Sequence, residues 1–368
     1  MKLIKTIKRI GSMSFNGSYL VTRGIVENKL MEISIFDINQ MNLVYSMEIE
    51  AYPNHVFGNN IFFKKGNKYL YYNFINSKLN ILHNSYDEKS ISFINNSNLH
   101  SLSKRYVKSG QSNKYEFFDF DKKIWEMDYK GSLILYSPTI FLLLSKKDGL
   151  SNRDEFSKIN PNTGEKIWHF NLDDHLDKLV SQYPFKHENK ISNLIGEYKN
   201  QLWFSMKNGG LLCLDSNSGE FLHYMRDEER NTAPWANSAG RHPILTSSRF
   251  AKLLKEEGRL IVIRKYYYWE LDLESLKISF HILKDYFEEI GYEGVKGVIP
   301  TIKGDQIITI DNRNSKFGAF NRKTLTFDWI EKLPKGMTRP RDIKMFRDKY
   351  FILTHNGNLL VYDDSPIV

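Results

Sequence analysis

The chain has 368 residues, of which 41% are hydrophobic and 14% aromatic, so it can bury a sizeable core and is not a disordered protein. The formal net charge is +9, but the basic residues are spread along the chain and form no dense run typical of a nucleic-acid-binding arm. The single cysteine, Cys213, excludes an intrachain disulfide and a cysteine-based metal cage.

The N-terminal segment Met1–Ile10 is basic and lacks the continuous apolar stretch of a signal peptide. No stretch of the sequence approaches transmembrane length. These features predict a soluble cytoplasmic protein without membrane contact.

One pattern recurs from the N-terminus to the C-terminus: an alternating apolar run, an Asp or Asn, a short polar turn and a second apolar run. The clearest copies are Ile159–Trp168 and Leu214–Leu222. In chain order, the eight copies turn at Asp37, Asn73, Asp121, Asn160, Asp215, Asp272, Asn321 and Asp363. An Asp or Asn side chain can accept hydrogen bonds from amides two residues on, and a glycine such as Gly164 tolerates a positive φ.

A further short apolar strand precedes each turn. The run 202–206 leads into Asn208-Gly209, and the run 351–354 leads into Asn356-Gly357. Asn-Gly between two alternating runs is the strongest short signal for a β-hairpin. Each repeat is therefore expected to be a small antiparallel meander.

The spacing of the repeats predicts a β-propeller. Division of 368 residues among eight repeats gives a mean of 46, the length of a four-stranded blade. The last repeat ends near Asp363 with too few residues left for its outer strand, which residues Leu3 to Ile10 can supply. We therefore expect an all-β chain that forms a single closed propeller domain, 1–368, of about eight blades. Seven blades are the alternative, because the copy around Tyr72-Asn73 is the weakest.

The segments Ile159–Trp168 and Leu214–Leu222 resemble the repeats of the quinoprotein, or PQQ-like, propeller superfamily. Those repeats read as an apolar strand, Asp, a few turn residues, Thr-Gly and a strand that often carries Trp. The resemblance is specific in two repeats, although the strand rhythm covers nearly the whole chain, and it implies the fold rather than an activity. The chain lacks the adjacent cysteines and the export signal of the secreted quinoprotein dehydrogenases, so no PQQ is expected.

Catalytic and metal-binding motifs are missing from the sequence. No two of the ten histidines have the spacing of a helical zinc site, and neither a phosphate-binding loop nor a hydrolase nucleophile motif occurs. Cys213 lies in an apolar run and is expected to be buried. His169, His223 and His281 are expected on outer strands. The sequence thus favours a protein that is not an enzyme, with no catalytic residue, metal or cofactor.

Three insertions between blades interrupt the repeats, at 171–190, 226–257 and 283–296. The first has the apolar spacing of a short amphipathic helix over 172–180. In a propeller the loops between blades share one face, so we expect a binding surface there. Its candidate residues are Arg226, Arg230, Trp235, Asn237, Arg241, His242, Tyr286, Tyr292, Arg339 and Arg341.

A rigid aromatic among planar donors is typical of binding hot spots, which favours a protein partner, and the arginines would suit an acidic one. A cytoplasmic inhibitor or a toxin-immunity protein fits this description. The alternative for Trp235 is a structural plug, with the arginines paired to Asp227, Glu228 and Glu229. Two other functions stay open: an enzyme that acts on an anionic small molecule in the central channel through His242, Arg241 and His187, and nucleic-acid binding through the basic face.

Overall fold

The computed structural model describes residues 1–25, 30–50, 54–57, 59–65, 68–83, 90–94, 100–106, 113–119, 122–129, 132–137, 140–147, 150–175, 191–206, 210–225, 248–296, 299–311 and 313–364. Contacts divide the chain into two compact units. The N-terminal unit contains residues 10–174 and 217–219, and the C-terminal unit contains residues 1–9, 175–216 and 220–368. A single domain over 1–368 stays a prediction.

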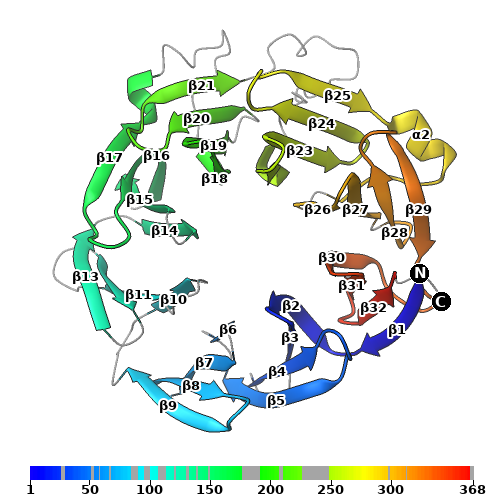
Figure 1. The fold of residues 1–368 in the computed structure, drawn as a ribbon, viewed down its shortest axis with the longest axis horizontal. Coiled ribbons are helices and arrows are strands. Elements are labelled where there is room, and N and C mark those ends of the chain that lie inside the picture. The colour runs from blue at the N-terminus through cyan, green and yellow to red at the C-terminus, as the bar shows by residue number, and fades with distance from the viewer. Residues whose placement is uncertain are drawn as a thin grey trace. The chain divides into compact units, whose positions relative to one another are not determined.

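The N-terminal unit contains four antiparallel sheets of four consecutive strands (Figure 1). The first contains β2 (Ile10–Asn16), β3 (Tyr19–Ile25), β4 (Leu30–Asp37) and β5 (Leu43–Glu50). The second contains β6 (Asn54–Phe57), β7 (Asn60–Lys65), β8 (Lys68–Asn73) and β9 (Lys78–His83). The third contains β10 (Ser90–Ile94), β11 (His100–Tyr106), β12 (Asn113–Asp119) and β13 (Lys122–Tyr129). The fourth contains β14 (Ser132–Ser137), β15 (Ile140–Lys147), β16 (Leu150–Ile159) and β17 (Lys166–Asn171).

The C-terminal unit contains four more sheets and the helix α2 (Lys284–Glu289). Its first sheet contains β18 (Ile191–Tyr198), β19 (Gln201–Met206), β20 (Leu211–Asp215) and β21 (Phe221–Met225). The next contains β22 (Lys252–Leu254), β23 (Arg259–Arg264), β24 (Tyr267–Asp272) and β25 (Ile278–Ile282). The third contains β26 (Thr301–Lys303), β27 (Gln306–Asp311), β28 (Lys316–Asn321) and β29 (Thr326–Lys332). The last contains β30 (Pro340–Phe346), β31 (Lys349–Thr354), β32 (Leu359–Asp363) and β1 (Lys2–Ile7).

The last sheet takes its fourth strand from the opposite end of the chain. β1 pairs antiparallel with β32, with Leu3 opposite Tyr362 and Ile7 opposite Leu359, and Figure 1 shows the two strands side by side. This pairing confirms the prediction that the N-terminal strand completes the last blade and covers an otherwise open edge. The exchanged strand is shorter than predicted, because Ile10 begins β2. The eight sheets, including the weakly predicted sheet of β6–β9, confirm the prediction of eight blades.

Where the third and fourth strands of a sheet are consecutive in the chain, the repeated Asp or Asn begins the turn between them. Asp37 Oδ1 accepts hydrogen bonds from the amides of residues 39 and 40, and Asp272 Oδ1 accepts from those of 274 and 275. Asn321 Oδ1 accepts in the same way from residues 323 and 324. These bonds satisfy turn amides and confirm the predicted turn chemistry. For the third repeat, β12 ends at Asp119, and Asp121 lies outside the described residues.

A tryptophan on the fourth strand of one sheet packs against the turn glycine of the next repeat. In the N-terminal unit, Trp125 lies against Gly164 and its Nε1 donates to the carbonyl of Pro161 at 2.7 Å. Trp168 lies against Gly219 in the same way. Both glycines have a positive φ, and a Cβ built on either would lie less than 3 Å from the indole. The turn glycine therefore serves both the backbone conformation and the close approach of the ring.

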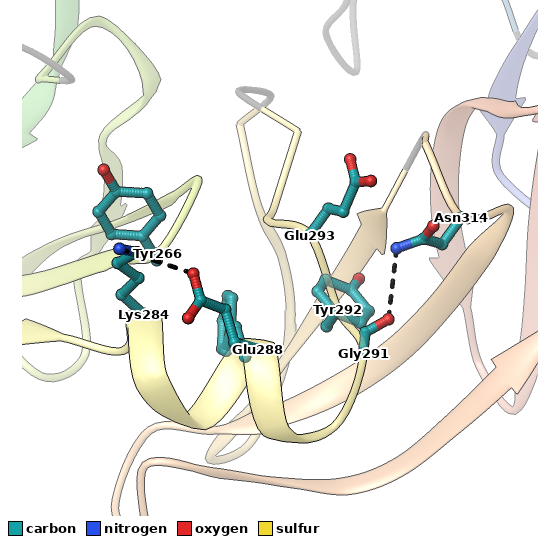
Figure 2. A pocket seen from close by; sticks show the side chains of 8 residues that line it. Tyr266, Lys284, Glu288, Gly291, Tyr292, Glu293 and Asn314 are labelled. Carbon is teal, nitrogen blue, oxygen red and sulfur yellow. Dashed lines mark hydrogen bonds and ion pairs between the residues drawn. The ribbon is translucent and has the colours of Figure 1, made fainter.

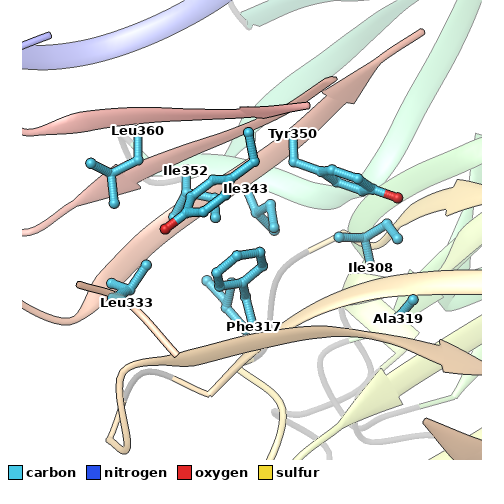
Figure 3. Packing of buried hydrophobic residues seen from close by; sticks show 10 residues of the cluster. Ile308, Phe317, Ala319, Leu333, Ile343, Tyr350, Ile352 and Leu360 are labelled. Carbon is cyan, nitrogen blue, oxygen red and sulfur yellow. The ribbon is translucent and has the colours of Figure 1, made fainter. Parts of the chain in front are cut away.

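Strands in the middle of a sheet are buried on both faces. In the C-terminal unit, Ile308 and Phe317 pack against Tyr350 and neighbouring side chains of the last sheet (Figure 3). Ile307, the residue before Ile308 on β27, packs in the cluster shared with the β22–β25 sheet. Successive side chains on a strand point to opposite faces, so these strands read as continuous apolar runs.

Candidate functional site

Six of the ten predicted binding residues lie outside the described residues: Arg226, Arg230, Trp235, Asn237, Arg241 and His242. The predicted helix over 172–180 is described only at its start, as the 3-10 helix Leu172–His175. The third insertion, 283–296, is fully described, and it carries Tyr286 and Tyr292. The candidate site is therefore built from this insertion and the strands that it contacts.

The insertion begins with the short helix α2, which is fixed to the β22–β25 sheet. The amide of Leu283 donates to the carbonyl of Tyr266 at 2.7 Å, and Phe287 of the helix is buried. At the helix end, Lys316 Nζ donates to the carbonyl of Gly291 at 2.6 Å, which satisfies a carbonyl that the helix leaves unpaired. The amide of Tyr292 donates back to Phe287 at 2.7 Å. The insertion is thus a folded part of the unit.

The two predicted binding tyrosines of this insertion hold it in place. Tyr292 is 1% exposed, and its hydroxyl shares a 2.9 Å hydrogen bond with Thr309. Burial raises the pKa of Tyr292 well above its usual range. Tyr286 is half-buried, and its hydroxyl accepts a 2.8 Å hydrogen bond from the amide of Phe327. The ring of Tyr292 is therefore buried within the insertion, and its role in binding stays a prediction.

Beside α2 lies a hollow of about 310 Å³, which we call the α2 hollow (Figure 2). Its floor contains the buried rings of Phe287 and Tyr292. Its rim contains Tyr266, Lys284, Glu288, Gly291, Glu293 and Asn314. Figure 2 shows Tyr266 and Lys284 on one side and Glu293 and Asn314 on the other. An apolar floor with a few polar groups at the mouth is the usual form of a binding pocket.

A buried carboxylate orders one side of this rim. Asp311 is fully buried and accepts hydrogen bonds from the amide of Glu293 at 2.8 Å and from Asn314 Nδ2 at 3.0 Å. It also accepts from the amide of Arg313 at 3.0 Å. Asn314 Nδ2 in turn lies 3.3 Å from the carbonyl of Gly291, as Figure 2 shows. The rim is therefore preorganised by hydrogen bonds that tie the insertion to the β27–β28 turn.

The charged side chains of the rim are Lys284, Glu288 and Glu293, on a segment that is acidic although the chain is basic. Between residues 284 and 293 there are four acids and one base. Glu288 pairs with Lys284 at 3.6 Å and Glu293 with Arg313 at 3.2 Å, and the side chains of all four are about half exposed or more. Exposed pairs of this kind contribute about 0 to 1 kcal/mol and are easily exchanged. The carboxylates can therefore turn to an incoming cation at little cost.

Arg339 and Arg341 lie at the start of β30 in the same unit. Arg339 is exposed, and its carbonyl accepts from the amide of His355 at 3.0 Å. Arg341 is half-buried, and its carbonyl accepts from Lys296 Nζ at 2.7 Å. The backbone of Arg341 is thereby joined to the end of the third insertion.

The remaining chemistry of the described residues is consistent with packing roles. Cys213 is fully buried, and burial raises its pKa to about 12. His169, His223 and His281 lie on the fourth strands β17, β21 and β25, as predicted. Among the described residues, no group of three or more His, Cys, Asp or Glu side chains is placed to hold a metal ion. In the same part of the chain, no helix is long and apolar enough to span a membrane.

No protein-family model matches the sequence, and a search of curated proteins found no match. Solved structures match over most of the chain. The C-terminal WD40 domain of Sif2 is 12% identical, with a TM-score of 0.57 over 98% of this chain and 97% of that one. Sqt1 of Saccharomyces cerevisiae is 11% identical, with a TM-score of 0.55 over 97% and 96%. A europium-containing methanol dehydrogenase is 10% identical, with a TM-score of 0.52 over 96% and 84%.

These likenesses show that the chain has a β-propeller fold. The methanol dehydrogenase is a PQQ-type propeller, which confirms the predicted resemblance to quinoprotein propellers at the level of the fold. At these identities the likeness concerns the fold alone, because one fold supports many unrelated functions.

Proposed function

We propose that the protein is a non-enzymatic binding protein that docks another protein on the surface around α2. The α2 hollow carries this proposal, because it combines a buried aromatic floor with a preorganised polar rim on an insertion outside the repeats. A rigid pocket of this kind can receive one anchoring side chain of a partner, which is how binding energy is concentrated in most interfaces. We also propose that the predicted binding residues in the segment 226–242, which contains the arginines and the tryptophan, contribute to docking of the same partner.

The charge of the rim supports a basic anchor. Glu288 and Glu293 stand on either side of the hollow, and the ring of Tyr266 forms a wall against which a lysine or arginine side chain can stack (Figure 2). An acidic partner, which the arginines of the sequence suggested, would be repelled at this position. An inhibitor or toxin-immunity protein acting in the cytoplasm is the finer form of the proposal, and the single buried cysteine is compatible with that compartment.

Affinity capture with matched charge-reversal variants tests the docking surface. The test variant is Glu288→Lys with Glu293→Lys, and the control is Glu48→Lys with Glu220→Lys, two exposed acids outside the third insertion. We expect a partner that is retained by the wild type and the control and is lost by the test variant. The purified partner should then bind the test variant about thirtyfold more weakly, the usual effect of a hot spot.

Two results would contradict the proposal. One is the same set of captured proteins, at the same yield, for all three proteins. The other is a purified partner whose affinity falls equally for the test and control variants, which would indicate a general effect of charge rather than a docking site. The melting temperatures of the variants must stay close to that of the wild type for either comparison.

A further inference from the structure

A second hollow, of about 590 Å³, lies at the other end of the same two sheets. The β22–β23 turn contributes Glu257, the β26–β27 turn contributes Asp305, and the β28–β29 turn contributes Arg322 and Lys323. Glu270 of β24 lies at its inner side. We call it the Arg322 hollow. None of these residues belongs to the α2 hollow, so the two sites are separate.

Arg322 is the central side chain of this hollow and is only 8% exposed. Its guanidinium contacts three carboxylates: Glu257, Glu270 at 3.4 Å and Asp305 at 3.4 Å. Its Nε is buried and donates to no acceptor among the described residues. A buried donor without an acceptor costs about 1 to 3 kcal/mol. The three carboxylates thus hold the Arg322 side chain in one orientation beside the hollow.

The charges that line the hollow balance. Three carboxylates, Glu257, Glu270 and Asp305, face three cations, Arg259, Arg322 and Lys323. The hollow therefore has no net charge from these six side chains that would favour an anionic or a cationic ligand. Neither gains a large net attraction. A ligand that accepts from the guanidinium and donates to a carboxylate fits both sets of groups.

We propose that the Arg322 hollow binds a saccharide. A sugar hydroxyl is both a donor and an acceptor, so one hydroxyl can accept from the Arg322 guanidinium or from the exposed ammonium of Lys323 while its neighbour on the ring donates to Glu257 or Asp305. The hollow has the size of ordinary small-molecule sites. It also contains apolar surface for the C–H face of a sugar, supplied by Leu325 and by the ring of His281.

Other groups at the mouth extend this donor and acceptor pattern. Ser279 Oγ and His281 Nε2 lie 2.9 Å apart, and the ring of His281 stacks on Tyr268 with centroids 6.0 Å apart. A peptide backbone, another neutral ligand with donors and acceptors, spaces these groups along a chain and must also place its side chains. In this hollow the donors and acceptors belong to side chains that lie close together. That spacing matches the neighbouring hydroxyls of a sugar ring better than the groups of a peptide backbone.

Saturation-transfer NMR on the purified full chain tests this site. The probes are glucose, galactose, mannose, N-acetylglucosamine and their common disaccharides, with inorganic phosphate, lysine and trialanine as ligands of the other classes. We expect at least one saccharide to give a transfer signal. The variants Asp305→Asn and Glu257→Gln, whose side chains are 35% and 39% exposed, should weaken its binding about tenfold or more.

The control variant is Glu293→Gln in the α2 hollow, which should bind the saccharide as the wild type does. The variant His281→Ala, at the mouth of the Arg322 hollow, is a second test of saccharide binding that leaves the ion pairs intact. The proposal is overturned if no saccharide of the panel binds, if binding is the same in all variants, or if phosphate or trialanine binds in place of a sugar. Because the test measures sugar binding alone, its result is independent of the protein-docking proposal.

Discussion

Replacement of Arg322 by methionine tests how far this residue fixes the β26–β29 sheet to the β22–β25 sheet. Methionine keeps much of the apolar stem and removes the guanidinium, which is buried among Glu257, Glu270 and Asp305. Loss of one partner from a buried ion pair typically costs about 3 to 5 kcal/mol, because a charge is left uncompensated.

The cost here should be lower than that range. Glu270, whose side chain is 10% exposed, keeps a 2.6 Å contact with Arg259 and the hydrogen bond from the Tyr268 hydroxyl. Glu257 and Asp305 are more than a third exposed and can be solvated. We therefore expect Arg322→Met to lower the free energy of unfolding by about 2 to 3 kcal/mol.

Urea unfolding, followed by tryptophan fluorescence, measures this change. The double variant Arg322→Met with Glu270→Gln should recover at least about 1 kcal/mol relative to the sum of the single effects, because the buried negative charge is removed with its partner. A single variant within about 0.5 kcal/mol of the wild type, or a double variant with strictly additive effects, would refute this account of the ion-pair network.

Three further changes have defined outcomes. Gly219→Ala should lower the free energy of unfolding by about 3 kcal/mol, since the φ of Gly219 is +74° and a Cβ would lie 2.6 Å from Trp168. In the same urea assay, Gly17→Ala should lower it by only about 1 kcal/mol, because Gly17 has a φ of +56° but open space for a Cβ. Cys213 should resist a thiol reagent near pH 8 until the chain unfolds, because its raised pKa of about 12 leaves about one thiolate in ten thousand; fast labelling of the native protein would contradict its burial. The free energy of unfolding should fall as the pH rises above about 10, because the pKa of Tyr292 is raised in the folded state and the unfolded chain loses that proton first; the Tyr292→Phe variant should show a shallower decline in alkaline thermal melts.

The fold could be predicted because its signals are local. Asp272 and Asn321 bond amides two and three residues on, so the turn chemistry is visible in the sequence itself. The regular spacing of such turns then gives the number of sheets. The exchange of β1 followed from the few residues left after Asp363, since an unpaired edge strand must be covered.

The candidate sites were only partly visible, because they depend on contacts between distant segments. Arg322 and Glu270 are 52 residues apart, and they meet only because two sheets pack face to face. Tyr292 was predicted as a binding residue of the third insertion. The sequence could not show that its ring is buried, because a tyrosine in a loop gives the same pattern whether it packs in the core or lies on the surface. The order of the rim comes from Asp311, whose burial has no signal in the sequence.

The two hollows share one apolar core, and this arrangement bears on whether they can communicate. Ile261, Tyr268 and Phe320 fill the space between the two sheets, and Phe287 and Tyr292 of the α2 hollow belong to the same cluster. Tyr268 is also in contact with His281 at the Arg322 hollow. A close-packed core transmits a change only if it has a second arrangement to adopt, and these rings are almost fully buried. We therefore expect a ligand in the Arg322 hollow to leave binding at the α2 hollow unchanged, with the shared core acting as a rigid support for both.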